Sequence, residues 1–99
     1  MKRGTTPTHE FVLPFSVDMV DDVEITYCQN GKEILKKYAD QCTMDGKTIS
    51  LKLSQDETFA FDENVNVEIQ LRVLTKGEDV CASDIFTVSC KRCLSDEVL

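Results

Sequence analysis

The chain has no tryptophan, a single histidine (His9) and no long apolar run. Without tryptophan it does not carry the Cys…Trp…Cys set of an antibody-type domain, and it has few aromatic side chains from which to build a sugar-binding platform. No segment approaches the roughly 18 apolar residues of a membrane helix. The basic start, Lys2-Arg3, is not followed by the apolar stretch of a signal peptide. We therefore expect a protein that is made in the cytoplasm and does not contact a membrane.

Basic residues are also scarce, with eleven Lys and Arg against eighteen Asp and Glu, for a net charge of −7. Both halves of the chain are acidic, so no basic arm is present that would bind nucleic acid or anionic lipid. Neighbouring acids such as Asp21-Asp22 and Asp62-Glu63 fall near predicted turns, which indicates a solvated rim. A weak calcium site is the alternative, although no segment has the D-x-[DN]-x-[DN]-G order of a dedicated calcium loop.

The five cysteines are many for 99 residues. An odd number without a signal peptide argues against a secreted disulfide framework. Cys90-Lys-Arg-Cys93 has the spacing of half a zinc site or of a redox pair, but it ends a predicted strand and no helix-length segment follows it. We favour reduced cysteines that pack as small apolar residues, with a metal site or a disulfide as the alternatives.

Alternation of apolar and polar residues dominates the chain and is strongest over Val65–Val73. This period is typical of antiparallel strands with one buried face. Asn30-Gly31 predicts a type I′ hairpin turn, and Asp45-Gly46 predicts a second one. Ser54-Gln-Asp-Glu57 is a capping box that predicts a single helical turn over Gln55–Phe59. The predicted strands lie near residues 9–16, 21–29, 32–39, 41–45, 47–53, 64–75 and 80–91.

These elements predict an all-β fold, an immunoglobulin-like Greek-key sandwich of about seven antiparallel strands with one short helical turn. A meander or a small barrel is the alternative architecture, and residues 32–40 have an alternative helical spacing. Pro14 suits an edge strand, because its missing N–H leaves no ladder bond unmade. Tyr27 and Tyr38 are both expected to point inward. We divide the chain into a flexible leader (1–8), one sandwich domain (9–94) and a C-terminal tail (95–99).

Six segments follow one another along the chain in a recognisable pattern: Phe11–Phe15, Val23–Gly31, Asp45–Leu51, Leu53–Thr58, Val67–Val73 and the tail Arg92–Leu99. This pattern resembles that of the small β-sandwich structural proteins of tailed phages and prophages of Firmicutes. The layout is also similar to the N-terminal domain of phage baseplate upper proteins. The resemblance implies a non-enzymatic accessory component of a virion or tail baseplate that acts through protein–protein contacts, and it supplies no site residue.

Seven apolar residues fall outside the alternation: Val12, Leu35, Leu74, Ile85, Leu94, Val98 and Leu99. The alternative is that they are scattered surface residues or pack at strand ends. The candidate interaction residues among them are Leu94, Val98, Leu99, Val12 and Ile85. They predict a contact with another virion protein or a second copy of the chain, with the tail docking on its neighbour.

His9 lies in the polar N-terminal segment, and we interpret it as an exposed side chain rather than a catalytic one. No catalytic, cofactor-binding or metal-binding residue is predicted. Two other hypotheses are a small adhesive or carbohydrate-binding module and a metal or redox protein centred on Cys90 and Cys93.

Overall fold

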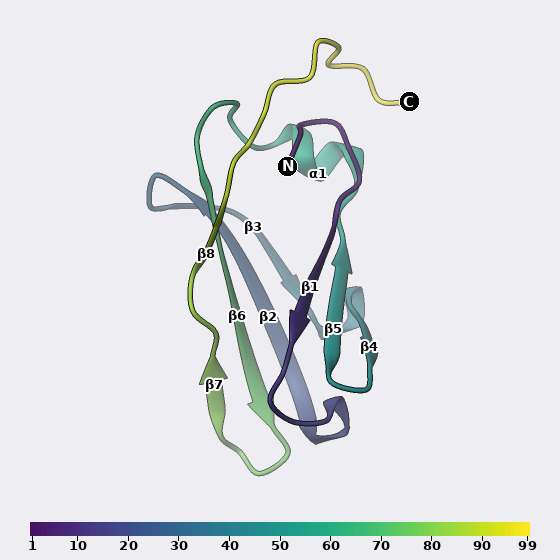
Figure 1. Ribbon diagram of the computed structural model, residues 1–99, viewed down its shortest axis with the longest axis vertical. Helices are drawn as coiled ribbons and strands as arrows, with labels where there is room; N and C mark the ends of the chain where they lie inside the picture. Colours follow the sequence, from purple (N-terminus) through teal and green to yellow (C-terminus); the bar gives the residue numbers. More distant parts are fainter.

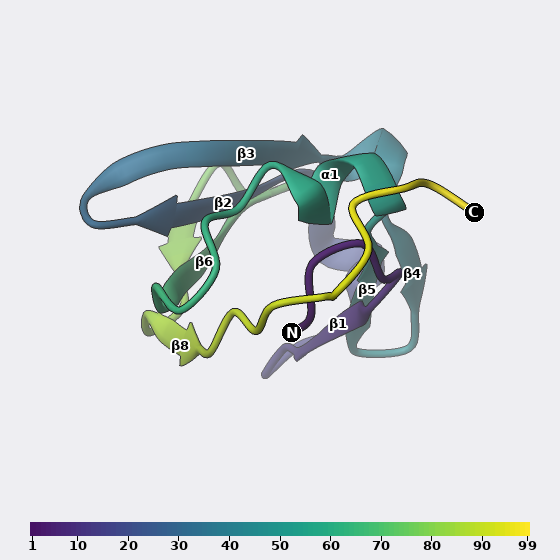
Figure 2. The same ribbon diagram turned by 90° about the horizontal axis from the view of Figure 1, so that it is seen from above.

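Two antiparallel sheets face one another in the computed structural model, which describes residues 1–99 (Figures 1 and 2). The smaller sheet has the order β1-β5-β4, and the larger has the order β3-β2-β6, with β7 and β8 both paired to the free side of β6. The strands are β1 (Thr8–Val12), β2 (Val20–Gln29), β3 (Lys32–Tyr38), β4 (Thr43–Asp45), β5 (Thr48–Lys52), β6 (Val67–Thr75), β7 (Val80–Ala82) and β8 (Phe86–Val88). The helical elements are α1 (Gln55–Phe59) and the 3₁₀ turns η1 (Val17–Met19) and η2 (Ala39–Gln41). None of these helices has the length and apolar character needed to cross a bilayer.

The predicted alternation places one apolar face of each sheet in the interior. The four inward residues of β6 are at most 3% exposed, whereas Glu68 and Arg72 between them face solvent. The core consists of Phe11, Leu13, Val23, Ile25, Tyr27, Ile49, Leu51, Leu53, Phe61, Val67, Ile69, Leu71, Val73 and Cys90. The predicted β-rich, two-layered architecture is therefore confirmed, and Cys90 packs as a core residue.

The local turn and helix signals are largely confirmed. Asn30 and Gly31 have φ values of 51° and 75°, as a type I′ turn requires, and they join β2 to β3. Helix α1 has the predicted bounds, with the Ser54 hydroxyl accepting from the Glu57 N–H and the Glu57 carboxylate accepting from the Ser54 N–H. Residues 32–38 form a strand, so the helical alternative is wrong.

The second hairpin turn lies one residue later than predicted, at Gly46-Lys47, because Asp45 pairs with Thr48. This register sets the half-buried Met44 opposite Ile49. The predicted register would have set Met44 opposite Lys47 and drawn that lysine inward. Inward packing of the two apolar side chains thus decides the register.

Two further expectations are corrected near the strand ends. The first strand stops at Val12 rather than continuing to residue 16, and Pro14 follows it on what is indeed an edge of the smaller sheet. Tyr38 was predicted to point inward but is 46% exposed. It is the last residue of β3, where the chain turns into η2 and no longer presents a face to the opposite sheet.

The predicted strand over residues 80–91 is interrupted by a bulge. Between the pairs Arg72↔Ala82 and Ile69↔Phe86, the three residues Ser83–Ile85 face only two residues of β6. Ser83 supports the bulge, because its hydroxyl accepts from the Leu71 N–H at 3.0 Å. The extra residue reverses the alternation, so that Phe86 and Val88 face the interior together with Cys90.

The two long sides of the sandwich are closed differently. On one side, η2 links β3 to β4, and an ion pair between Lys37 and Glu57 joins β3 to α1. On the other side, β1 and β7 belong to different sheets and do not pair. At the upper end of that side, the Met1 amine donates to the Ser89 carbonyl at 2.9 Å, and residues 1–3 run parallel to residues 89–91. Below this contact no strand pairing joins the two sheets, and we call this the open side (Figure 1).

Candidate functional site

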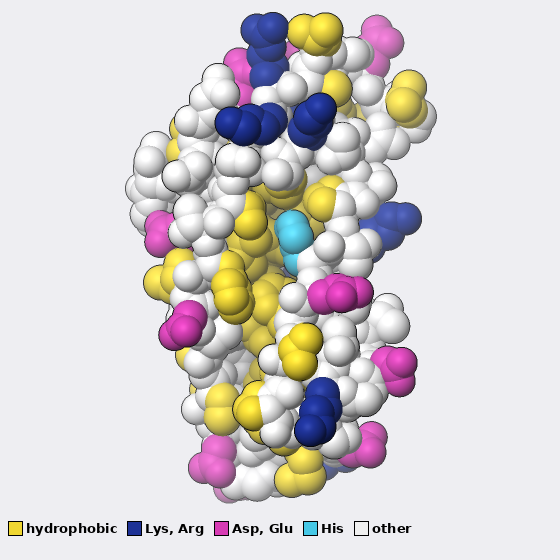
Figure 3. All heavy atoms as spheres, viewed as in Figure 1, with side chains coloured by type: hydrophobic (Ala, Val, Ile, Leu, Met, Phe, Trp, Pro, Cys, Tyr) yellow, Lys and Arg dark blue, Asp and Glu magenta, His cyan; other side chains and the backbone are white.

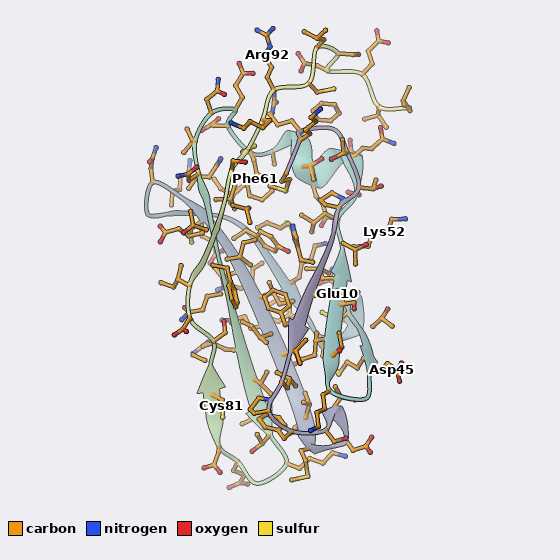
Figure 4. The ribbon with its side chains drawn as sticks, in the orientation of Figure 1. Glu10, Asp45, Lys52, Phe61, Cys81 and Arg92 are labelled. Carbon is orange, nitrogen blue, oxygen red and sulfur yellow. The ribbon has the colours of Figure 1, made fainter.

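An apolar groove of about 500 Å³ runs along this open side, between β1 and β7. Hydrophobic side chains form a continuous strip down this face of the molecule (Figure 3). Glu10 on β1 and Cys81 on β7 lie on opposite sides of it (Figure 4). The residues that line it are Glu10, Phe11, Val12, Leu13, Pro14, Phe15, Leu71, Val73, Cys81, Ala82, Ser83 and Phe86. We call this feature the open groove.

The floor of the open groove is the core of the sandwich. Leu71 and Val73 of β6 are 3% and 2% exposed, and Phe11 of β1 is 6% exposed. Above this floor, Phe86 remains 48% exposed although its ring packs against Phe11, with 6.0 Å between the ring centroids. The bulge at Ser83–Ile85 creates this wall, because without the extra residue Phe86 would face away from the groove.

Both strands beside the open groove have unpaired backbone groups on the groove side. The Leu13 N–H donates to the Lys47 carbonyl and the Leu53 N–H donates to the Pro7 carbonyl, so odd-numbered residues of this segment bond to β5. In an antiparallel ladder the intervening residues point their N–H and C=O groups the other way. Thr8, Glu10 and Val12 therefore direct these groups away from β5, toward the open edge.

The same alternation holds for β7. The Thr75 N–H donates to the Asp79 carbonyl and the Ser83 N–H donates to the Leu71 carbonyl, so residues 79, 81 and 83 face β6. Val80 and Ala82 consequently direct their backbone groups toward the open edge. An apolar groove flanked by two such edges is suited to an extended chain with apolar side chains.

The candidate interaction residues are all exposed but do not form one patch. Val12, 78% exposed, is on the rim of the open groove. Ile85 projects from the bulge beside a shallow depression on the outer face of the larger sheet. Leu94 lies with Arg92 at the upper end of the molecule. The Leu99 backbone is hydrogen-bonded to the Gln55 side chain of α1, and no other residue of the tail bonds to Gln55. Only Val12 thus belongs to the groove.

The alternation signal missed most of the groove, because it assigns Phe11, Leu13, Leu71 and Val73 to the core without indicating that one side of the core is open. The alternation over Phe86–Cys90 correctly predicts that Phe86 points inward, but its side chain is 48% exposed. Its exposure depends on which strands lie beside it, and that is a long-range property.

His9 is not the exposed side chain that the sequence suggested. It lies on β1, is half-buried, and its Nδ1 is 2.7 Å from the Tyr27 hydroxyl. Burial, together with the positive N-terminus, lowers the pKa of His9. Burial also raises the pKa of Tyr27, as do the nearby Cys42 and Glu57. Both effects favour the neutral forms, so this pair acts as a hydrogen bond between the two sheets.

The cysteines are dispersed. All five are free thiols, and Cys90 is buried in the core while Cys81 is exposed at the open groove. Burial raises the pKa of Cys90, which keeps it protonated and of low reactivity. No three His, Cys, Asp or Glu side chains are grouped so that they would hold a metal ion.

The open groove is thus the feature of the surface with the most distinctive chemistry. Its apolar lining and its unpaired strand edges distinguish it from the rest of the surface. No family model matches this chain, and no curated protein matches it either.

Proposed function

We propose that this is a non-enzymatic protein that works by binding another protein along the open groove. The observation that carries the proposal is the juxtaposition of an apolar groove with two unpaired strand edges. Exposed apolar surface of this kind marks contact sites in folded proteins. The one histidine is bonded to Tyr27 and does not line the groove.

We further propose that the sandwich is of the immunoglobulin-like Greek-key type. In that fold one sheet contains strands B, E and D, and the other contains C′, C, F and G. The orders β1-β5-β4 and β3-β2-β6-β7/β8 match these two sets, with β7 and β8 together in the position of G. In this assignment the edge beside β1 is the position of strand A, which supports the interpretation of that edge as a binding site.

A role in a tailed-phage or prophage particle is the third part of the proposal, and it rests on the resemblance of the sequence patterns. A virion accessory protein of this kind would use the open groove to attach to its neighbour. The alternative of a carbohydrate-binding module is less favoured by the groove itself, because nine of its twelve lining residues are hydrophobic. Sugars need convergent polar groups for recognition.

The experiment is site-specific photo-crosslinking in cells that carry the natural gene. A photoreactive amino acid replaces Val12 on the groove rim, and in the control variant it replaces Lys52, which is exposed and points away from the groove (Figure 4). We expect one discrete protein adduct from position 12 and none from position 52. Purified phage particles should contain the same adduct. Equal adducts from both positions, or none from position 12, would contradict the proposed binding role.

A further inference from the structure

We infer that the open groove receives one extended segment of a protein partner, which adds as a strand to the free edge of β1, carries apolar residues at alternate positions and lacks acidic residues. This inference rests on the proposed binding function and specifies the chemistry of the partner. It commits to β1 rather than β7 because the β1 edge is five residues long, whereas β7 has three residues and ends at the bulge.

The shape of the molecule supports a strand-sized occupant. Its accessible surface is 6178 Å², compared with about 5,700 Å² expected for a compact monomer of this mass. The Cα radius of gyration is 14.2 Å, compared with about 12.6 Å expected for this chain length. Only 16 of the 99 residues are buried. The molecule therefore exposes more surface than a typical domain of this size, and a strand laid beside β1 would cover the exposed groove residues Val12 and Phe86.

The backbone and side chains of β1 specify how the segment binds. Thr8, Glu10 and Val12 each offer one N–H and one C=O to a neighbouring strand. Alternate side chains of that strand would then point into the groove over Leu71 and Val73, and the others would point to solvent. Apolar residues at every second position satisfy this geometry.

Charge defines the partner further. Glu10 is the one charged residue that lines the groove, and the whole chain has a net charge of −7. A second copy of the chain fits poorly, because antiparallel pairing of two β1 edges about Glu10 would set two carboxylates directly opposite each other. Like charges in that position are destabilising. A neutral or basic segment of a different protein meets no such opposition.

The test uses the full 99-residue protein and a synthetic peptide in which valine alternates with threonine between terminal lysines. Amide hydrogen exchange is followed residue by residue by NMR. At a peptide concentration of roughly ten times its Kd, exchange at Thr8, Glu10 and Val12 should slow about tenfold, because these amides exchange only when the peptide is released. An isomer with its valines in one block should have no effect, and a version with glutamate ends should bind more weakly.

The matched variants are Glu10→Pro and Glu10→Ala. Proline removes the outward N–H of residue 10 while leaving the bonds to β5, so it should weaken peptide binding at least about tenfold, whereas alanine keeps the N–H and should not. If Glu10→Pro fails to fold, the hydrogen bonds can be removed from the peptide instead, by N-methylating the positions whose N–H groups would donate to β1. The N-methylated peptide should not bind.

Several results would overturn the inference. Binding that survives Glu10→Pro and N-methylation would show that the groove takes apolar side chains without strand addition. Equal binding of the glutamate-ended peptide would overturn the charge requirement, and a dimer that Glu10→Pro dissociates would identify a second copy as the occupant. No peptide effect at all would also overturn it. In each case a groove-specific adduct from position 12 would still stand, so failure of this inference and failure of the proposed function are distinguishable.

Discussion

Two phenylalanines, Phe61 and Phe86, provide a direct comparison between the closed core and the open groove. Phe61 is 1% exposed, and its ring meets that of Tyr27 edge-on with 5.9 Å between the centroids. Replacing it with alanine should cost about 3–5 kcal/mol of unfolding free energy. Phe86 is 48% exposed. Its truncation should therefore lose about half of the 1.5–3 kcal/mol that complete burial of such a side chain contributes. Its contact with Phe11 adds about 0.5 kcal/mol. We therefore expect Phe86→Ala to cost about 1.5 kcal/mol, at most half the cost of Phe61→Ala.

The assay is urea unfolding under reducing conditions, which keep the five thiols free. Far-UV circular dichroism follows the sheets, and because the chain has no tryptophan, its fluorescence comes from the buried Tyr27 and the half-exposed Tyr38. Both variants should keep the wild-type slope with urea, which indicates that the folded and unfolded states remain the same. If Phe86→Ala destabilises the protein as much as Phe61→Ala, then Phe86 belongs to a sealed core and the reasoning about an open groove is refuted.

Three further perturbations test other parts of the structure. Gln29→Leu should cost about 2–4 kcal/mol in urea unfolding, because the Gln29 amide bonds the backbone of the loop after α1 and its loss leaves buried groups unpaired; a loss under 1 kcal/mol would contradict this. Since the pKa of His9 is lowered from 6.5, the unfolded chain takes up the proton first, and stability should fall as the pH drops through and below that value. His9→Phe should remove this part of the pH dependence, and an unchanged pH profile would contradict the burial of His9 as the cause of its lowered pKa. Gly4→Ala should lower the melting temperature, because φ is 75° and the added Cβ would lie 2.4 Å from the Phe59 ring; an unchanged melting temperature would contradict that close approach.

Most of the secondary structure was predictable because its causes are local. The period-two pattern of Val65–Val73 and the Asn30-Gly31 turn each describe a short segment whose neighbours need not be known. The capping box at Ser54 and Glu57 likewise fixes the start of α1 by bonds within one turn.

What the sequence did not predict depends on contacts between distant segments. The bulge at Ser83 is defined against β6, and the register of the second hairpin is decided by inward packing of Met44 against the core. The bond between His9 and Tyr27 joins residues of different sheets. The open groove is the largest such omission, because alternation identifies inward faces but not which pair of edges remains apart.

An open edge also has to avoid unwanted pairing. The β1 edge carries the charge of Glu10 and is followed by Pro14, and the β7 edge ends at the bulge with Asp84 beside it. Charges, prolines and bulges at edges are the features by which β proteins limit indiscriminate association. These features do not oppose the apolar, non-acidic partner strand inferred above.

The most direct measurement is amide hydrogen exchange along β1 in the protein alone. The account predicts an alternating pattern, in which the amides of His9, Phe11 and Leu13 are protected by β5 while those of Thr8, Glu10 and Val12 exchange rapidly. Equal protection at all six positions would show that the outer edge of β1 is already paired, which would contradict the open groove and the binding role built on it.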